Sequence, residues 1–347
     1  MEQHGGSPAK RRTRLHDPAL GDCLPARLTR AYEAPREWHQ MNMNARDNIP
    51  ELLAPAAVIT GATQGIGRAL ADEFAKGGHT LLLVARTEAA LAKTASEVSA
   101  KYNVPVHYAA CDLSTREGCD HLEQALSSNG LYCESLVNNA AIMIAGFFQE
   151  QDPETLRKLV DLNIRAAVDL TRRFLPDMLA RDKGGVLNVA SLEGFMPVPY
   201  QATYAGSKAF LISWSRALAW EVFGTGVRVC VVTPGTIETK MHAKAGAEYS
   251  RYVLYTPAMT PEAMAEAAYR RFMKGNWVIT EGWVNRIIAF GVRFIPGIML
   301  IPAVGWFCRV RDAEGNLQWP KPLPSPEQAA KSAPAKREAG EKTRKAS

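Results

Sequence analysis

Short apolar runs alternate with amphipathic segments along the middle of the chain. Six of these runs are largely apolar and cover residues 56–60, 80–85, 106–110, 136–137, 185–189 and 227–232. Segments of helical pattern, such as residues 88–100, lie between them. Nearly continuous apolar strands that alternate with helices are typical of a parallel sheet covered on both faces. The pattern predicts one doubly wound, Rossmann-type α/β domain over residues 51–285, with residues 275–280 as an edge strand.

The two ends of the chain have a different pattern. Residues 1–50 are polar and are interrupted by Pro8, Pro18, Pro25 and Pro35, which predicts a poorly structured extension. Residues 286–312 are strongly apolar and predict a helical C-terminal extension. Residues 313–347 are rich in proline, then in Ala, Lys, Glu and Ser, and predict a disordered tail.

The distribution of net charge along the chain argues against nucleic acid as a partner of the folded part. The 347-residue chain has a net charge of +6, divided as +2 over residues 1–50, +1 over 51–310 and +3 over 311–347. A nearly neutral middle argues against a nucleic-acid-binding core, which needs a basic face on the folded part. The six cysteines form no CxxC pair and have no metal-ligand spacing, so we expect free thiols, a reducing compartment and no metal site.

A glycine-rich segment follows the first predicted strand and opens a helix. Residues 60–67 contain Gly61, Gly65 and Gly67 in the spacing Gly-x-x-x-Gly-x-Gly. Glycines allow a tight turn, a close approach of backbone to a pyrophosphate and close packing of helix on strand. The N–H groups at the start of the helix then face the phosphates. This context predicts a dinucleotide site.

Residues at the ends of the second and third strands indicate the form of the dinucleotide. Sites for NAD usually place Asp or Glu after the second strand, whereas this chain has Arg86 there. A guanidinium suits a 2′-phosphate, so we expect NADP(H) in preference to NAD(H), with Thr63 as a further donor. Asp112, after the third strand, is placed to contact the adenine amino group.

A phenol and an ammonium group are spaced to share one helix face. Tyr204 and Lys208 are four residues apart, and Ser191 follows the fifth predicted strand. A nearby positive charge favours phenolate, so the spacing predicts that the pKa of Tyr204 falls from about 10 towards neutrality. Such a tyrosine exchanges protons with a substrate oxygen. Ligands bind at this edge of an α/β sheet.

Taken together, these motifs resemble the short-chain dehydrogenase/reductase family, in the branch with TGxxxGxG and YxxxK motifs. The matching elements occur in family order over about residues 52–285: residues 60–67, 138–140, Asn163, Ser191, Tyr204 with Lys208, and residues 234–239. One departure is visible, because Ala141 stands where the family usually has glycine. Its methyl group is tolerable if its φ is negative, so it puts local loop shape in doubt more than activity.

The resemblance implies a role for each site residue. Tyr204 is the general acid in carbonyl reduction, Lys208 holds the nicotinamide ribose and lowers the tyrosine pKa, and Ser191 binds the substrate oxygen. Asn163 fixes a water in a proton relay from Lys208, and Ile237 with Thr239 contacts the carboxamide. The implied cofactor-binding set is Gly61, Thr63, Gln64, Gly65, Ile66, Gly67, Arg86, Asp112, Leu113, Asn139, Ala140, Tyr204, Lys208, Pro234, Gly235, Ile237 and Thr239.

The segment after Thr239 is where the family varies and where a substrate lid usually lies. Residues 240–260 are rich in tyrosine and apolar residues, which suggests an apolar pocket; we interpret His242 as a surface or lid residue rather than a catalytic one. Residues 283–310 are apolar and interrupted by arginines, and their uncharged run 294–308 is shorter than the ~20 residues that span a bilayer. Three interpretations stay open: packing over the pocket or at a dimer interface, peripheral membrane contact, or a true span.

The sequence therefore predicts an NADP(H)-dependent oxidoreductase that interconverts an apolar ketone or aldehyde and its alcohol. The alternative is a catalytically silent dinucleotide-binding regulatory or scaffold protein, which the intact set of Asn163, Ser191, Tyr204 and Lys208 disfavours. A 3-oxoacyl chain or a hydroxysteroid are alternative substrates suggested by family members. Family practice implies a homodimer or homotetramer. We expect a cytoplasmic location, with membrane association through residues 283–310 left open.

Overall fold

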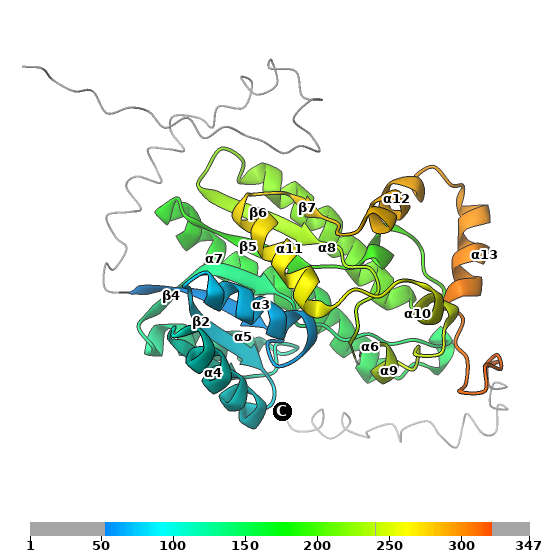
Figure 1. The fold of residues 1–347 in the computed structure, drawn as a ribbon, viewed down its shortest axis with the longest axis horizontal. Helices are drawn as coiled ribbons and strands as arrows, with labels where there is room; N and C mark the ends of the chain where they lie inside the picture. Colours follow the sequence, from blue (N-terminus) through cyan, green and yellow to red (C-terminus); the bar gives the residue numbers. More distant parts are fainter. Residues whose placement is uncertain (1–52, 240, 321–347) are drawn as a thin grey trace, which may run out of the picture.

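The computed structural model describes residues 53–239 and 241–320, and their core is one seven-stranded parallel sheet (Figure 1). The strand order is β3-β2-β1-β4-β5-β6-β7. The strands are β1 (Ala54–Thr60), β2 (Thr80–Ala85), β3 (Val106–Ala110), β4 (Leu131–Asn138), β5 (Gly184–Val189), β6 (Val227–Val232) and β7 (Val278–Ile279). The doubly wound α/β fold predicted from the sequence is confirmed.

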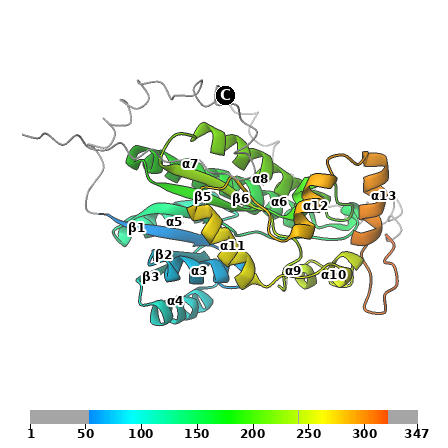
Figure 2. The ribbon, with the colours of Figure 1, turned by 45° about the horizontal axis from the view of Figure 1, so that its top comes forward.

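Helices cover both faces of the sheet, which explains why the strands are apolar throughout (Figure 2). One face carries α3 (Gly65–Lys76), α4 (Glu88–Tyr102) and α11 (Pro261–Met273), with Phe74 and Phe272 fully buried against the strands. The other face carries α5 (Arg116–Ser128), α7 (Ala166–Arg181) and α8 (Ala202–Glu221), with Leu122 and Leu170 buried. Two apolar layers therefore hold the sheet rigidly beneath the site.

The strand order reverses between β1 and β4, where the chain moves from one half of the sheet to the other. Loops leaving the carboxyl ends of these neighbouring strands diverge there and leave a crevice, the usual ligand position in an open α/β sheet. The short helices α6 (Pro153–Val160), α9 (Met241–Lys244) and α10 (Arg251–Tyr255) lie at this end of the molecule (Figure 1).

Two apolar helices, α12 (Trp283–Gly291) and α13 (Gly297–Cys308), continue from β7 at the same end (Figures 1 and 2). Cys308 is buried with Val198 and Ala205, and the guanidinium carbon of Arg251 lies 3.7 Å from the centre of the Trp306 ring. The C-terminal extension therefore packs beside the lid helices rather than extending away. Helix α12 runs across residue 285, where we expect the catalytic domain to end.

No helix within residues 53–239 and 241–320 combines the length and apolarity needed to cross a bilayer. The predicted N-terminal extension (residues 1–50) and most of the predicted tail (residues 313–347) lie outside the described residues, as does Lys240 of the predicted lid. Five cysteines of the described part are free and buried; Cys23 lies outside it.

Candidate active site

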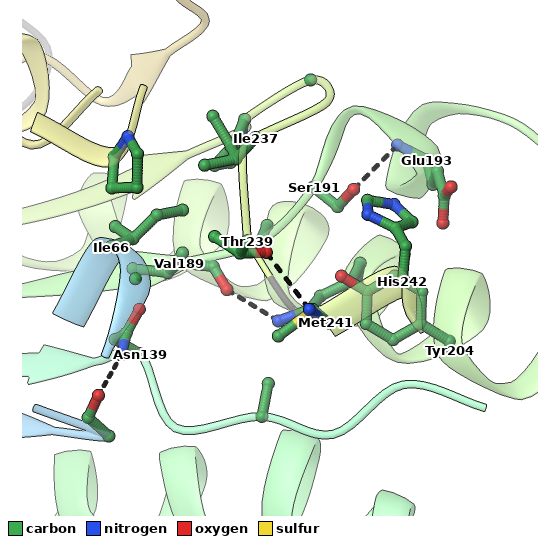
Figure 3. Close-up of a pocket in the computed structure, with 18 of the residues that line it drawn as sticks. Ile66, Asn139, Val189, Ser191, Glu193, Tyr204, Ile237, Thr239, Met241 and His242 are labelled. Atoms are coloured by element: carbon green, nitrogen blue, oxygen red, sulfur yellow. Dashed lines mark hydrogen bonds between the residues drawn. The ribbon is translucent and has the colours of Figure 1, made fainter. Parts of the chain in front are cut away.

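A cavity of about 430 Å³ opens at the carboxyl ends of β1, β4, β5 and β6. It brings together segments far apart in the sequence: the glycine loop, the loops after β4 and β5, the helix that carries Tyr204 and Lys208, and the segment after β6. Figure 3 shows Ile66 of the glycine loop on one side of the cavity and Tyr204 with Ser191 on the other. One cavity thus brings the glycine loop together with Ser191, Tyr204 and Lys208.

The glycine loop between β1 and α3 has the geometry that its sequence predicts. Gly61 and Gly65 have φ of +67° and +55°, values that side chains with a Cβ rarely adopt. A Cβ on Gly67 would lie 2.3 Å from both Asn139 Nδ2 and Gly61 O, so no larger residue fits. The N–H groups in the first turn of α3 have no intrahelical acceptor. The loop therefore presents a cradle that fits a pyrophosphate.

A threonine and an asparagine fasten the glycine loop to β4. Thr60 Oγ1 donates to Val137 O (2.9 Å) and accepts from the backbone N–H groups of Asn139 (2.9 Å) and Ala140 (3.0 Å). Asn139 Nδ2 donates to Thr60 O (2.8 Å). The φ of Ala141 is not positive, so the methyl group that departs from the family pattern sits on an ordinary backbone. Asn139 and Ala140 both line the cavity.

The residues predicted to select the 2′-phosphate are not among those that line the cavity. Arg86 directly follows β2 and is exposed, and Thr63 of the glycine loop is half-buried. The backbone N–H of Gly61 donates to Val84 O (2.8 Å), which ties the glycine loop to the end of β2 beside Arg86. Gln64 is exposed at the start of α3, where its Oε1 accepts from Lys244 Nζ (3.3 Å).

Asp112, predicted to bind adenine, already has partners in the structure. Its Oδ2 accepts from Lys158 Nζ (2.8 Å), and its Oδ1 accepts from Ser114 N (3.0 Å) and Oγ (2.7 Å). Partial burial raises the pKa of Asp112, but these hydrogen bonds outweigh it and lower the pKa to about 2. The carboxylate is thus fixed and charged after β3. The neighbouring Leu113 is buried.

Lys208 is held at the end of β5. Lys208 is 3% exposed, and its Nζ donates to Val189 O (2.8 Å), the carbonyl of the last residue of β5. Burial lowers the pKa of Lys208 to about 8, against the opposing charge of Glu193. The ammonium nitrogen lies 5.6 Å from the centre of the Tyr204 ring. The predicted i, i+4 pair is therefore present on one face of α8.

The predicted fall in the pKa of Tyr204 is wrong for this structure. Tyr204 is 7% exposed, and its burial raises the pKa well above the usual value. The negative charge of Glu193 raises it further, whereas an interaction with the Ser191 hydroxyl lowers it. Desolvation of the phenolate is the largest cause, and the Lys208 ammonium donates its hydrogen bond to the Val189 carbonyl. Tyr204 is therefore a protonated phenol in this structure.

Asn163 lies in a single turn of π-helix, η2 (Asp161–Arg165), between α6 and α7. Its Nδ2 donates to Ile142 O (2.9 Å) and to Ser207 Oγ (3.1 Å), and its Oδ1 accepts from Ile142 N (3.0 Å). It therefore links the loop after β4 to the helix that carries Lys208. Single π turns often occur at functional sites.

Residues 234–239, which follow β6, form one wall of the cavity. Gly235, Ile237 and Thr239 line it together with Pro234, and Thr239 Oγ1 accepts from Met241 N (3.4 Å; Figure 3). A Cβ on Gly235 would lie 2.7 Å from the side chain of Asn285, so α12 packs directly on this segment. From the lid, Met241, His242 and Tyr252 also face the cavity.

Some features of the site carry no clear signal in the sequence. Glu193 lines the cavity but sits in a short 3-10 helix, η3 (Leu192–Phe195), that no motif marks. The role of Val189 comes from its backbone carbonyl, which every residue has. The π turn at Asn163 follows a helical pattern that looks continuous in the sequence. Among the described residues, no three His, Cys, Asp or Glu side chains cluster as metal ligands.

Comparison with known proteins agrees with this geometry. The family model for short chain dehydrogenase matches residues 55–250. A very-long-chain 3-oxoacyl-CoA reductase of Scheffersomyces stipitis is 36% identical over 257 residues, which cover 70% of this chain and 72% of that protein. The protein of the same name in Laccaria bicolor is 39% identical over 168 residues, 48% of this chain and 50% of that one. Several matches thus span only half to two thirds of the relatives' length.

Solved structures share the fold. A short-chain dehydrogenase from Sphingobium yanoikuyae in complex with NADPH superposes with a TM-score of 0.62, at 29% identity over 71% of this chain and 96% of that one. L-sorbose reductase from Gluconobacter frateurii, complexed with NADPH and L-sorbose, gives 0.59 at 30% identity, over 66% and 95%. With a family model that matches more than half of the chain and solved structures that share its sheet, this chain belongs to the short chain dehydrogenase family.

Proposed function

We propose that the protein is an NADP(H)-dependent reductase of an apolar carbonyl compound. The convergence of Ser191, Tyr204 and Lys208 in the cavity that begins at the glycine loop supports this most directly. The nicotinamide, when bound, supplies the hydride. The chain contributes the cradle for the pyrophosphate, the orientation of the carbonyl and the proton.

The protonation of the site favours reduction. Since burial keeps the pKa of Tyr204 high, its phenol is available to donate a proton to the oxygen of the reacting carbonyl. The Ser191 hydroxyl donates a second hydrogen bond to that oxygen and stabilises its developing negative charge. Lys208, held at Val189 O, positions the ribose hydroxyl groups and supplies positive charge beside Tyr204.

NADP(H) in preference to NAD(H) is supported by the end of β2. NAD sites usually have Asp or Glu directly after the second strand, and this chain has the exposed Arg86 there. A guanidinium pairs bidentately with a phosphate, and Thr63 offers a hydroxyl group at the same end of the glycine loop.

A 3-oxoacyl chain is the substrate class that we favour over a hydroxysteroid. The relatives named very-long-chain 3-oxoacyl-CoA reductases support it, and so does the position of the apolar helices α12 and α13 beside the lid. The alternative of a silent dinucleotide-binding protein predicts NADPH binding without turnover. Spectrophotometric NADPH oxidation with a panel of 3-oxoacyl, steroid and aromatic ketones separates the reductase from the silent binding protein. Turnover supports the reductase proposal, and NADPH binding without turnover contradicts that proposal.

We also propose that the C-terminal helices contact an anionic membrane surface. Six large apolar side chains form what we call the C-terminal apolar face: Trp283, Ile287, Phe290, Phe294, Ile298 and Met299, each more than 60% exposed. Residues 283–311 contain four arginines and no acidic residue. Apolar side chains flanked by cations suit the interface of a bilayer with acidic headgroups.

Self-association as a homodimer or homotetramer is the remaining part of the proposal. The outer side of α8 leaves Phe210 and Trp220 more than a third exposed, and Phe210 stacks on Trp214 with ring centres 6.0 Å apart. Apolar aromatic surface on a catalytic helix favours contact with a second copy. Light scattering of the purified chain tests this, and a monomeric mass contradicts it.

A further inference from the structure

A buried glutamate without a hydrogen-bond partner lies in the reaction cavity. Glu193 is 4% exposed, and neither of its carboxyl oxygens has a partner in the structure. Its backbone N–H donates to Ser191 Oγ (3.2 Å), which fixes η3 against the catalytic serine. Figure 3 shows Glu193 on the side of the cavity that holds Ser191, His242 and Tyr204, away from Ile66 of the glycine loop. It is therefore on the substrate side.

Another buried glutamate has an ionic partner within the fold. Glu134, 9% exposed, pairs with Lys183. A buried carboxyl group that lacks such a partner costs free energy of folding, because it has lost its hydrogen bonds to water. The Glu193 carboxyl group makes no hydrogen bond that stabilises the fold. A ligand in the cavity would supply the missing hydrogen-bond partner.

Glu193 is poised between its two protonation states. Burial raises its pKa to about 7, and the positive charge of Lys208 opposes this rise. The other titratable or charged groups around it are Tyr204 on α8, Tyr252 on α10, His242 on α9, Cys308 on α13 and Arg293 after α12, which lies over Phe195 of η3. In its neutral form the carboxyl group carries one O–H donor that needs an acceptor.

We propose that Glu193 is a specificity-determining residue that donates a hydrogen bond to a second carbonyl oxygen of the substrate, near the reacting one. The inference rests on the proposed reductase function and defines its substrate class as 1,3-dicarbonyl compounds such as 3-oxoacyl chains. Ser191 and Tyr204 bind the oxygen that is reduced, and Glu193 binds the oxygen of the ester or thioester. A plain ketone leaves Glu193 unpaired.

Matched substrates test this proposal. Ethyl 3-oxododecanoate and 2-undecanone carry the same alkyl chain on the reacting ketone and differ in the second carbonyl. We measure kcat/KM with NADPH for the wild type, Glu193→Gln and Glu193→Leu, and compare the ester-to-ketone ratio. Since one hydrogen bond is worth about tenfold, we expect the ratio to fall about tenfold in E193L. We expect E193Q, which keeps an N–H donor, to stay within about threefold of the wild type.

The pH dependence of the same ratio gives a second, independent readout. A carboxylate cannot donate, so the wild-type ratio falls as the pH rises from 6 to 8.5 through the pKa of Glu193. The amide of E193Q does not titrate, so its ratio stays constant. Titration of Tyr204, Lys208 or His242 affects both substrates and leaves the ratio unchanged. If E193L fails to fold, the comparison of wild type with E193Q still decides.

Each negative result has a distinct meaning. An unchanged ratio in E193L, with turnover retained, overturns the role of Glu193 and leaves the reductase proposal standing. Absence of Tyr204-dependent turnover with every carbonyl contradicts the reductase function itself. A binding measurement gives a readout that does not need turnover. Ethyl 3-hydroxydodecanoate should raise the Tm of the wild-type complex with NADP⁺ more than 2-undecanol does. Equal shifts in wild type and E193L contradict the proposed contact.

Discussion

Lys208 Nζ donates a 2.8 Å hydrogen bond to the carbonyl oxygen of Val189, so an ammonium that is 3% exposed is fixed to the end of β5. This contact sets the position of the charge relative to Tyr204, whose ring centre lies 5.6 Å away. The hydrogen bond fixes a side chain of α8 to the strand that Ser191 follows. The link between β5 and α8 therefore fixes the positions of Ser191, Tyr204 and Lys208 relative to one another.

Replacement of Lys208 by methionine should separate activity from stability. The variant loses the positive charge beside Tyr204 and the contact that we propose to the ribose, so we expect kcat/KM for carbonyl reduction to fall at least about a hundredfold. Steady-state NADPH oxidation measures this. A fall of less than threefold would contradict the role of Lys208.

The stability of the same variant should depend on pH. Burial lowers the folded-state pKa of Lys208 from 10.5 to about 8, so the folded protein binds fewer protons than the unfolded chain between these values. The free energy of unfolding of the wild type therefore gains from rising pH in that window, on the order of 3 kcal/mol. Lys208→Met lacks this gain. Its stability relative to the wild type should be highest near pH 7 and should decline towards pH 10 in thermal unfolding experiments.

Substitution of Gly67 by alanine should damage the cofactor cradle. A Cβ there meets Asn139 Nδ2 and Gly61 O at 2.3 Å, so the loop or α3 must move, at a cost of about 1–3 kcal/mol. We expect a lower Tm and an NADPH Kd raised at least about tenfold in fluorescence titration. Gly206→Ala on α8 is the matched control, because nothing lies within 4 Å of its Cβ and alanine favours helix. Equal behaviour of the two variants would contradict the packing role of Gly67.

Arg86→Ala should change the preference between the two cofactors. Charged hydrogen bonds to the 2′-phosphate contribute about 1.5–3 kcal/mol, so we expect KM for NADPH to rise tenfold or more, with KM for NADH within about twofold. Lys93→Ala is the control, because Lys93 is an exposed cation on the nearby α4. An equal rise in both KM values would show that Arg86 does not read the 2′-phosphate.

Polar substitutions on the C-terminal apolar face should weaken membrane binding. The combined variant Ile287→Ser, Phe294→Ser and Ile298→Ser removes side chains that are 61%, 70% and 85% exposed. We expect the wild type to sediment with vesicles of phosphatidylserine and phosphatidylcholine, and the variant to stay in the supernatant. Phe148→Ser, at a residue 62% exposed but outside this face, should bind like the wild type. Equal sedimentation of all three proteins would exclude the proposed surface.

The sequence predicts the parallel sheet because its strands are buried on both faces and hence apolar throughout. The apolar run at residues 136–137 marks only part of β4, and β7 has two residues within a longer predicted edge strand. Tyr204, Lys208 and Ser191 could be predicted because their chemistry depends on spacing along a helix and on position after a strand. The direction of the pKa shift of Tyr204 could not, because desolvation depends on packing by distant segments.

The environment of Glu193 could not be predicted from the sequence either. Its neighbours in the sequence do not reveal that its carboxyl group is 4% exposed and unpartnered, since α8, α10 and α13 enclose it only in the folded chain. The paths of α12 and α13 are likewise set by contacts such as that of Asn285 with Gly235, which no local pattern encodes.

The central claim is that Tyr204 is the proton donor of an NADPH-dependent carbonyl reductase. The decisive measurement is NADPH oxidation with 3-oxoacyl esters by the wild type and by Tyr204→Phe, with NADPH affinity measured in parallel. Phenylalanine keeps the buried ring and removes the hydroxyl group. We predict a loss of at least about a thousandfold in kcat with NADPH Kd within about threefold. Wild-type protein that binds NADPH but reduces no carbonyl, or a variant that retains full turnover, would contradict the account.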